Sequence, residues 1–233
     1  MPYRRFPKTD TARLNSLRTL LDNSSVYAAK SRFIDMDVIN RAKACYDRLG
    51  TLCNGFLRSY EAQMLGYRRI AKPQKRMMMY AQHFVRVLGM CIERGEIKAA
   101  ALHDCYGIDD IDETLRLLHA ADDAYRIVPG IVEGEKRRIA GGGRPIYNPT
   151  VGMVATHYDI FKDMYEQQRI LNDKADRALT ALKALRAEVD PLIVDIWNQV
   201  EAHFAHLPSE ERLDECRRYG LIYYYRTGEK RPQ

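Results

Sequence analysis

The sequence predicts an all-α protein. Apolar residues recur every three or four positions over long runs, and dipeptides typical of hairpin turns are almost absent. Three prolines, Pro73, Pro149 and Pro191, each stand at the head of a helix-compatible run. Proline is tolerated at the first helical position because its missing N–H would have no partner there. Asn148 and Asp190 precede two of these prolines and are residue types that cap helix N-termini, so the prolines predict helix starts.

The first half of the chain contains five predicted helices. Thr9 and Asp10 cap the first, whose leucines lie at helical spacing. The second helix carries an apolar stripe over many turns, and three glycines within it, Gly50, Gly55 and Gly66, predict close packing or a kink. Pro73 opens the third helix, and Tyr106-Gly107 ends the fourth. The predicted spans are 10–22, 36–70, 73–94, 98–105 and 110–119, with a connection over 23–35.

The second half repeats this organisation. Pro129-Gly130 interrupts the pattern over 120–140, and a helix resumes at 131–140. Residues 136–145 are the clearest flexible segment. Long helices follow from Pro149 to about residue 188 and from Pro191 to Pro208. A short helix then runs from Ser209 to Tyr219-Gly220, and residues 221–226 favour a short strand.

We therefore expect one all-helical domain over residues 1–233. Two long antiparallel helical hairpins would form a four-helix-bundle-like core with short accessory helices. The Tyr-Gly pairs at 106–107 and 219–220 lie 113 residues apart. This spacing suggests an internal duplication, with halves of about 1–118 and 119–233.

Composition indicates an ordinary globular protein, with 46% hydrophobic and 29% charged residues. No apolar run approaches the roughly 18 to 20 residues that span a bilayer, and no apolar segment follows the basic N-terminus as in a secretory signal. The five cysteines form no CxxC pair. We expect reduced core thiols in a cytoplasmic protein that does not contact membranes.

The net charge of +6 is concentrated at the chain ends. Residues 1–30 and 217–233 each carry +4, so the middle of the chain, 31–216, carries −2. This distribution predicts that the long helices are not a basic surface. The basic ends are either solvated tails or contacts for nucleic-acid phosphates.

The glycine-rich loop Gly141–Gly143 is the first candidate site. Arg137, Arg138 and Arg144 flank it and could clamp an anion near a helix N-terminus. The loop lacks the Gly-Lys-Ser/Thr sequence of a P-loop. A plain mobile connector is the alternative.

The tyrosine-rich tail is the second candidate site. Tyr223, Tyr224, Tyr225 and Arg226 interleave aromatic and basic side chains. Such a segment can pack on the bundle, mediate self-association or partner docking, or stack on nucleic-acid bases.

A histidine pair near a helix end is a weak metal candidate. His203 and His206 are three residues apart and follow Glu201, so they share one helix face. The chain contains no Glu-x-x-His pair of the kind that di-iron bundles use. A solvated helix end is the alternative, and the run Met77–Met79 favours core packing over a copper site.

Three segments give the chain a resemblance to a known group. Residues 148–150, 196–201 and 219–226 (NPT, IWNQVE and YGLIYYYR) resemble an uncharacterised family of bacterial all-helical proteins with no assigned function. The likeness extends from Tyr3 to the tail. It implies a bacterial cytoplasmic protein and supplies no active-site residues.

The expected function is that of a non-enzymatic helical scaffold or protein-interaction protein. We expect self-association or another protein as the partner, no catalytic residues and no cofactor. The alternatives are a nucleic-acid-associated protein that uses its basic termini, and a metal- or small-molecule-binding bundle at His203 and His206.

Overall fold

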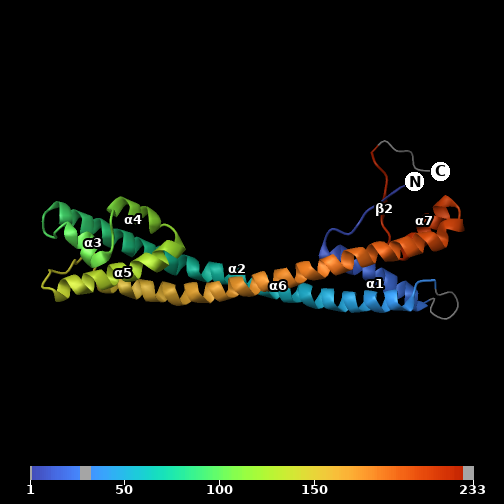
Figure 1. Cartoon of the computed structure of the whole chain (residues 1–233), viewed down its shortest axis with the longest axis horizontal. Helices are drawn as coiled ribbons and strands as arrows, with labels where there is room; N and C mark the ends of the chain where they lie inside the picture. Colours follow the sequence, from blue (N-terminus) through green and yellow to red (C-terminus); the bar gives the residue numbers. More distant parts are fainter. Residues whose placement is uncertain (1, 27–32, 228–233) are drawn as a thin grey trace. The chain divides into compact units, whose positions relative to one another are not determined.

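The computed structural model describes residues 2–26 and 33–227, and it confirms the all-α class (Figure 1). Two helices, α2 and α6, are far longer than the others. The only strands in the described part of the chain are two short ones, which pair antiparallel. The elements are β1 (Tyr3–Arg4), α1 (Asp10–Val26), α2 (Met36–Glu93), α3 (Ala100–Tyr106), α4 (Ile111–Leu117), α5 (Ala121–Ala140), α6 (Val151–His203), the 3-10 helix η1 (Phe204–His206), α7 (Ser209–Arg218) and β2 (Tyr223–Tyr224).

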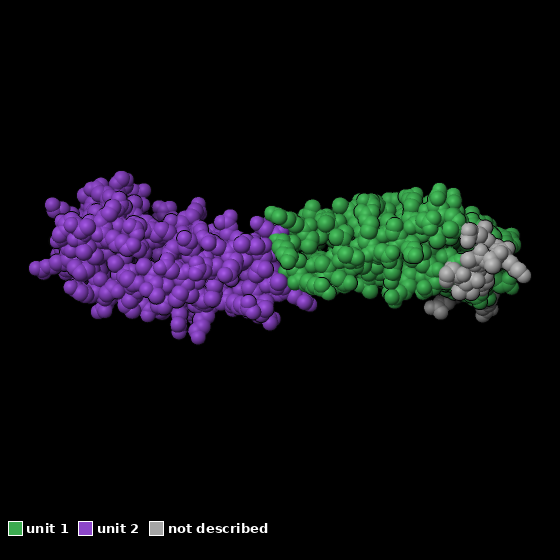
Figure 2. All heavy atoms as spheres, turned by 90° about the horizontal axis from the view of Figure 1, so that it is seen from below, with its two compact units in different colours: residues 1–60, 174–233 green, residues 61–173 purple. Residues whose placement is uncertain are grey.

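The chain forms two compact units, coloured separately in Figure 2. Unit 1 combines residues 1–60 with residues 174–233, and unit 2 is the continuous segment 61–173. Both α2 and α6 pass from one unit into the other. The unit boundaries at 60/61 and 173/174 differ from the division near residue 118 that a duplication suggests, and that duplication stays a prediction.

Helices α2 and α6 each replace two predicted helices, so the expected helix starts at Pro73 and Pro191 are wrong. Both prolines lie inside continuous helices, as does Pro129 in α5. Proline in a helix interior costs about 3 kcal/mol. Apolar side chains on both sides of each proline are buried, such as Ile70 and Met77 around Pro73, and each contributes about 1.5–3 kcal/mol. This burial outweighs the local cost, and each helix continues.

The predicted caps change accordingly. Asp190 lies within α6, where its carboxylate accepts hydrogen bonds from a side chain of α1. Helix α6 begins at Val151 rather than at Pro149. Its first turn is capped by Thr150, whose hydroxyl accepts a hydrogen bond of 3.3 Å from the Met153 amide.

Unit 1 is a helical core on which α1 and the segment around Leu221 are packed. Arg48 of α2 bonds Glu188 of α6 at 3.0 Å, and Phe33, just before α2, stacks on His203 of α6. Residue numbers rise along one helix as they fall along the other, so the two segments run antiparallel. Helix α1 packs on them through Leu17 and Leu20. The core also contains Leu49, Leu182, Leu185, Val189, Ile193, Ile196, Trp197 and Val200.

Unit 2 packs α5 against the antiparallel segments of α2 and α6. Gln63 of α2 bonds Asn172 of α6 at 3.0 Å, and Tyr80 stacks on His157 with ring centroids 4.2 Å apart. Helices α3 and α4 cover the same core. Its fully buried members include Met77, Phe84, Val85, Leu88, Leu118, Val128, Ile131, Val154 and Phe161.

Glycine has a packing role at a few positions only. A Cβ at Gly134 would lie 2.5 Å from the Cys105 carbonyl, so this glycine lets α5 approach α3. A Cβ at Gly66 would similarly collide with the side chain of Gln168. Gly50 and Gly55 face open space, so the close packing expected at those two glycines is absent.

The expected flexible segment 136–145 is partly wrong. Residues up to Ala140 belong to α5, and only the following residues form a loop. Gly107 and Gly220 adopt left-handed φ values of 64° and 88°, as predicted for the ends of their helices. Within the described residues, none of the helices has the length and apolar character that crossing a bilayer requires.

Candidate functional site

A buried carboxylate organises the loop that contains the predicted arginine clamp. Glu135 of α5 is 0% exposed, and both of its oxygens accept hydrogen bonds. Arg138 donates from Nε at 2.7 Å and from Nη2 at 2.8 Å. The Ile146 amide donates at 3.0 Å, and the Tyr106 hydroxyl donates a short hydrogen bond. The network therefore joins α5 to α3 and to the loop before α6.

The three predicted clamp arginines have different surroundings. Arg138 is paired with Glu135 and also donates to the Arg144 carbonyl at 2.5 Å. Arg137 donates to the Cys105 carbonyl at 2.7 Å. The Arg144 side chain is exposed and has no side-chain partner among the described residues. Arg138 therefore has a structural role that the sequence did not reveal.

Electrostatics supports this structural assignment. Burial of Glu135 would raise its pKa, but hydrogen bonds from Arg138, Tyr106 and the Ile146 amide together hold the pKa below its ordinary value of 4.5. Burial and the Glu135 carboxylate raise the pKa of Tyr106, which keeps this phenol protonated. The ion pair is thus fully charged near neutral pH.

The tyrosine tail pairs with the N-terminal segment of the chain within unit 1. Strand β2 pairs with β1, so that Tyr3 faces Tyr224 and Arg4 faces Tyr223. Glu201 of α6 accepts hydrogen bonds from Arg4 at 2.9 Å and from the Tyr223 hydroxyl at 2.7 Å. Burial raises the pKa of Tyr223, whereas its hydrogen bond and that of Arg4 outweigh burial and lower the pKa of Glu201. Tyr223 therefore anchors the tail and is not free for a ligand.

The remaining tail residues form an exposed surface. Tyr3, Ile222 and Tyr224 are 37%, 45% and 41% exposed. The guanidinium of Arg226 lies 4.3 Å from the centroid of the Tyr3 ring. Tyr225 helps to line a pocket of 630 Å³ between the tail and α7, together with Leu213, Asp214 and Arg217. We call Tyr3, Ile222 and Tyr224 the tail face.

Several described cations of the basic chain ends are paired with carboxylates. Arg4 bonds Glu201, Arg217 bonds Asp214, and Arg218 bonds Glu215. A cation that already has a carboxylate partner gains less from a phosphate. These three arginines are thus less suited to phosphate contacts than their sequence suggests.

The two candidate metal ligands do not converge. The rings of His203 and His206 are 6.3 Å apart at 86°, and His203 stacks on Phe33 at 3.8 Å. Burial, and to a lesser extent the charge of His206, lowers the pKa of His203. Glu201 is engaged with Arg4. The described residues contain no cluster of three or more His, Cys, Asp or Glu side chains arranged to hold a metal ion.

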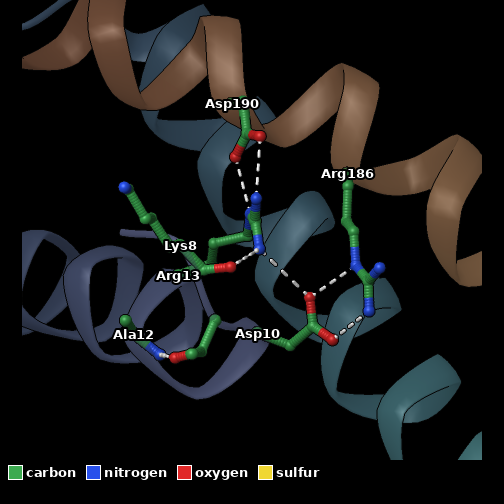
Figure 3. A network of polar contacts seen from close by, with 7 residues as sticks. Lys8, Asp10, Ala12, Arg13, Arg186 and Asp190 are labelled. Atoms are coloured by element: carbon green, nitrogen blue, oxygen red, sulfur yellow. Dashed lines mark hydrogen bonds and ion pairs between the residues drawn. The ribbon is translucent and has the colours of Figure 1, made fainter. Parts of the chain in front are cut away.

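A network of four charged residues, shown in Figure 3, was missed by the sequence reasoning. Arg13 of α1 bonds Asp190 of α6 at 2.6 and 2.8 Å. Arg186 of α6 bonds Asp10 of α1 at 2.8 and 2.6 Å, and Arg13 also reaches Asp10 at 3.3 Å. Each helix contributes one acid and one base, so the network fixes the register between α1 and α6.

This network lies beside a small pocket in unit 1. The pocket has a volume of 510 Å³ and is lined by Arg13, Asp190 and apolar side chains. One of these, Phe6, is stacked on Trp197 with centroids 5.1 Å apart. Arg13 and Asp190 of the lining are bonded to each other, and Arg13 also donates to the Lys8 carbonyl at 3.1 Å, so these groups attach the N-terminal segment. The other lining residues are Pro7, Lys8, Pro191, Ile193 and Val194.

The thiols mostly lie in or against the core, as predicted, whereas the Met77–Met79 run belongs to it only in part. All five cysteines are free, and Cys45, Cys91 and Cys216 are buried. Burial raises the pKa of Cys45 and Cys216, which makes both thiols less reactive. Met77 is fully buried, whereas Met79 is exposed.

Comparison with family models, curated proteins and solved structures finds no match to this chain. The resemblance to an uncharacterised bacterial family therefore stays a prediction.

Proposed function

We propose that this chain is a non-enzymatic helical scaffold that self-associates through the tail face of unit 1. The carrying observation is that the two chain ends pair as β1 and β2 and leave Tyr3, Ile222 and Tyr224 together at the surface. Tyrosine is enriched at protein interfaces because its ring buries a large apolar area while its hydroxyl stays hydrogen-bonded. A bacterial, cytoplasmic setting is part of the same proposal.

The polar chemistry of the chain supports a structural role. The most buried carboxylate, Glu135, has its oxygens saturated by groups of its own unit. Glu201 and Asp190 are likewise engaged with arginines. Such fully bonded groups stabilise a fold and have little capacity left to move protons or bind a substrate.

A second copy is the partner that fits the tail face best. In the described residues, β2 pairs only with β1, so its other edge has no paired strand. An antiparallel strand pair is self-complementary about a two-fold axis, which is the commonest symmetry of homo-oligomers. The arrangement of one chain as two long antiparallel helical hairpins with a four-helix-bundle-like core stays a separate prediction.

Light scattering coupled to size-exclusion chromatography tests the proposal. The wild type is expected at twice the chain mass of 27.0 kDa. I222S/Y224S is expected to elute as a monomer with unchanged helicity, because both side chains lie on the tail face. Deletion of residues 219–233 is a poorer test because it also removes the buried residues Tyr219 and Leu221.

L57S/Y60S is the matched control. Leu57 and Tyr60 are 52% and 45% exposed in the same unit, on α2 rather than at the tail. This variant is expected to stay dimeric. A monomeric wild type, or an equal loss of association in both variants, would exclude the tail face as the interface.

A further inference from the structure

The exposed side of α2 in unit 2 carries a concentrated run of positive charge. Residues 68–86 contain six Lys or Arg residues and no Asp or Glu. The expectation that the long helices have no basic surface is therefore wrong here, because the average over 31–216 hides this local run.

The helix places these cations on one face. At about 100° per residue, most of them fall within an arc of about 100°, opposite the buried stripe of Ile70, Met77 and Phe84. The face extends about 27 Å along the helix, at a rise of 1.5 Å per residue. All of its members are exposed. We call the following residues the basic stripe: Arg68, Lys72, Lys75, Arg76, His83 and Arg86.

The side chains of the basic stripe, like those of Arg144 and some other surface cations, have no protein partner among the described residues, whereas the arginines of the ion-pair networks do. Arg13, Arg48, Arg138 and Arg186 all pair with carboxylates. None of the basic-stripe side chains makes an ion pair or hydrogen bond with another described residue. Their charge is therefore available to an external anion.

The surface along the stripe is hollowed. A groove of 650 Å³ runs beside α2 and is lined by Lys75, His83, Arg86 and by His119 after α4. Gln74 and Gln82 line it as well and can donate hydrogen bonds to anionic oxygens.

From this face we infer that unit 2 binds the phosphate backbone of double-stranded nucleic acid through the basic stripe, independently of base sequence. A row of cations spaced one to two helical turns apart complements a regular linear array of phosphates. The stripe carries no Phe, Tyr or Trp on which unpaired bases could stack, which favours duplex over single strands.

A lipid surface fits less well. A helix that lies in a bilayer interface inserts an apolar face next to its basic face. The apolar face of this helix segment is already buried in the core of unit 2, and Met79 is the large apolar side chain at the centre of the stripe. Charge alone would have to hold the stripe on a membrane.

The test is fluorescence anisotropy of a labelled mixed-sequence DNA duplex of about 24 base pairs with the full chain. With about five phosphate contacts, affinity is expected to fall roughly 10²–10³-fold between about 50 and 200 mM salt. The variant K72Q/K75Q/R76Q/R86Q is expected to bind at least tenfold more weakly and to reduce the salt slope by about 3 to 4. Glutamine preserves helix propensity at these exposed positions, and K75Q/R86Q provides a milder second variant.

The matched control is R48Q/R126Q/K136Q/R217Q, which removes the same charge from side chains that are at least half exposed and already paired. It is expected to retain wild-type affinity and slope. The inference is overturned by absent binding at about 50 mM salt, by an unchanged stripe variant, or by an equal loss in the control. Equally tight binding of poly-glutamate or of anionic vesicles would also overturn it. None of these results depends on whether the tail face forms a dimer.

Discussion

Replacement of Glu135 with alanine is expected to destabilise unit 2 by about 3–5 kcal/mol, because it leaves the Arg138 side chain, which is only 10% exposed, without its counter-charge. The Tyr106 hydroxyl and the Ile146 amide lose their acceptor in the same step. Urea denaturation followed by circular dichroism measures the effect. E166A is a suitable control, since Glu166 is an exposed acid of the same unit.

A double-mutant cycle separates the ion pair from general packing. E135M/R138M removes both charges, and replacement of a buried pair by apolar residues is often close to neutral. We expect the double variant to be at least about 2 kcal/mol more stable than the sum of the single variants predicts. Strictly additive losses would show that the two side chains do not depend on each other.

The same carboxylate gives a pH dependence of known sign. The pKa of Glu135 is lower in the folded chain than its ordinary value of 4.5. The contribution of the Glu135 carboxylate to the free energy of unfolding is thus complete above pH 4.5. It is lost as the pH falls through the lower pKa of the folded chain. The E135M/R138M variant should lose less stability than the wild type over this acidic range.

Replacement of Gly134 with alanine is expected to cost about 1–3 kcal/mol. The new Cβ would lie 2.5 Å from the Cys105 carbonyl and 2.8 Å from the Tyr106 Cα, so α3 and α5 would have to separate. Both obstructing atoms belong to the backbone and cannot rotate away. Thermal unfolding of the full chain measures the loss.

Gly55 provides the control for this substitution. It also lies within a helix, but a Cβ there meets no atom within 4 Å. G55A should therefore stabilise the chain by up to about 1 kcal/mol through helix propensity. If both alanine variants shifted stability in the same direction, the close approach of α3 and α5 would be refuted.

Features set by local chemistry could be predicted from the sequence. The α3 end at Gly107 and the start of α7 at Ser209 depend on neighbouring residues, and both agree with the structure. The helix starts predicted at Pro73 and Pro191 are wrong because a local sequence signal carries no information about how many apolar side chains are buried on either side of the proline. Continuity of the helices is a property of packing rather than of nearby residues.

The networks depend on contacts between residues distant in the chain. Arg13 and Asp190 are 177 positions apart. In the sequence alone, each has the pattern of an ordinary surface charge on its own helix. Glu135 did leave a signal, because it follows Val128 and Ile131 on the buried stripe of α5. An acid at an apolar position predicts a buried partner, and Arg138 lies one turn further on.

Hydrogen exchange of the full chain, read by mass spectrometry, tests most directly whether α2 and α6 are continuous packed helices. Peptides that span Pro73 and Pro191 are expected to be protected as strongly as their neighbours within the same helices. Rapid exchange over 70–76 and 188–194, between protected flanks, would contradict this account and favour separate helices joined at the prolines.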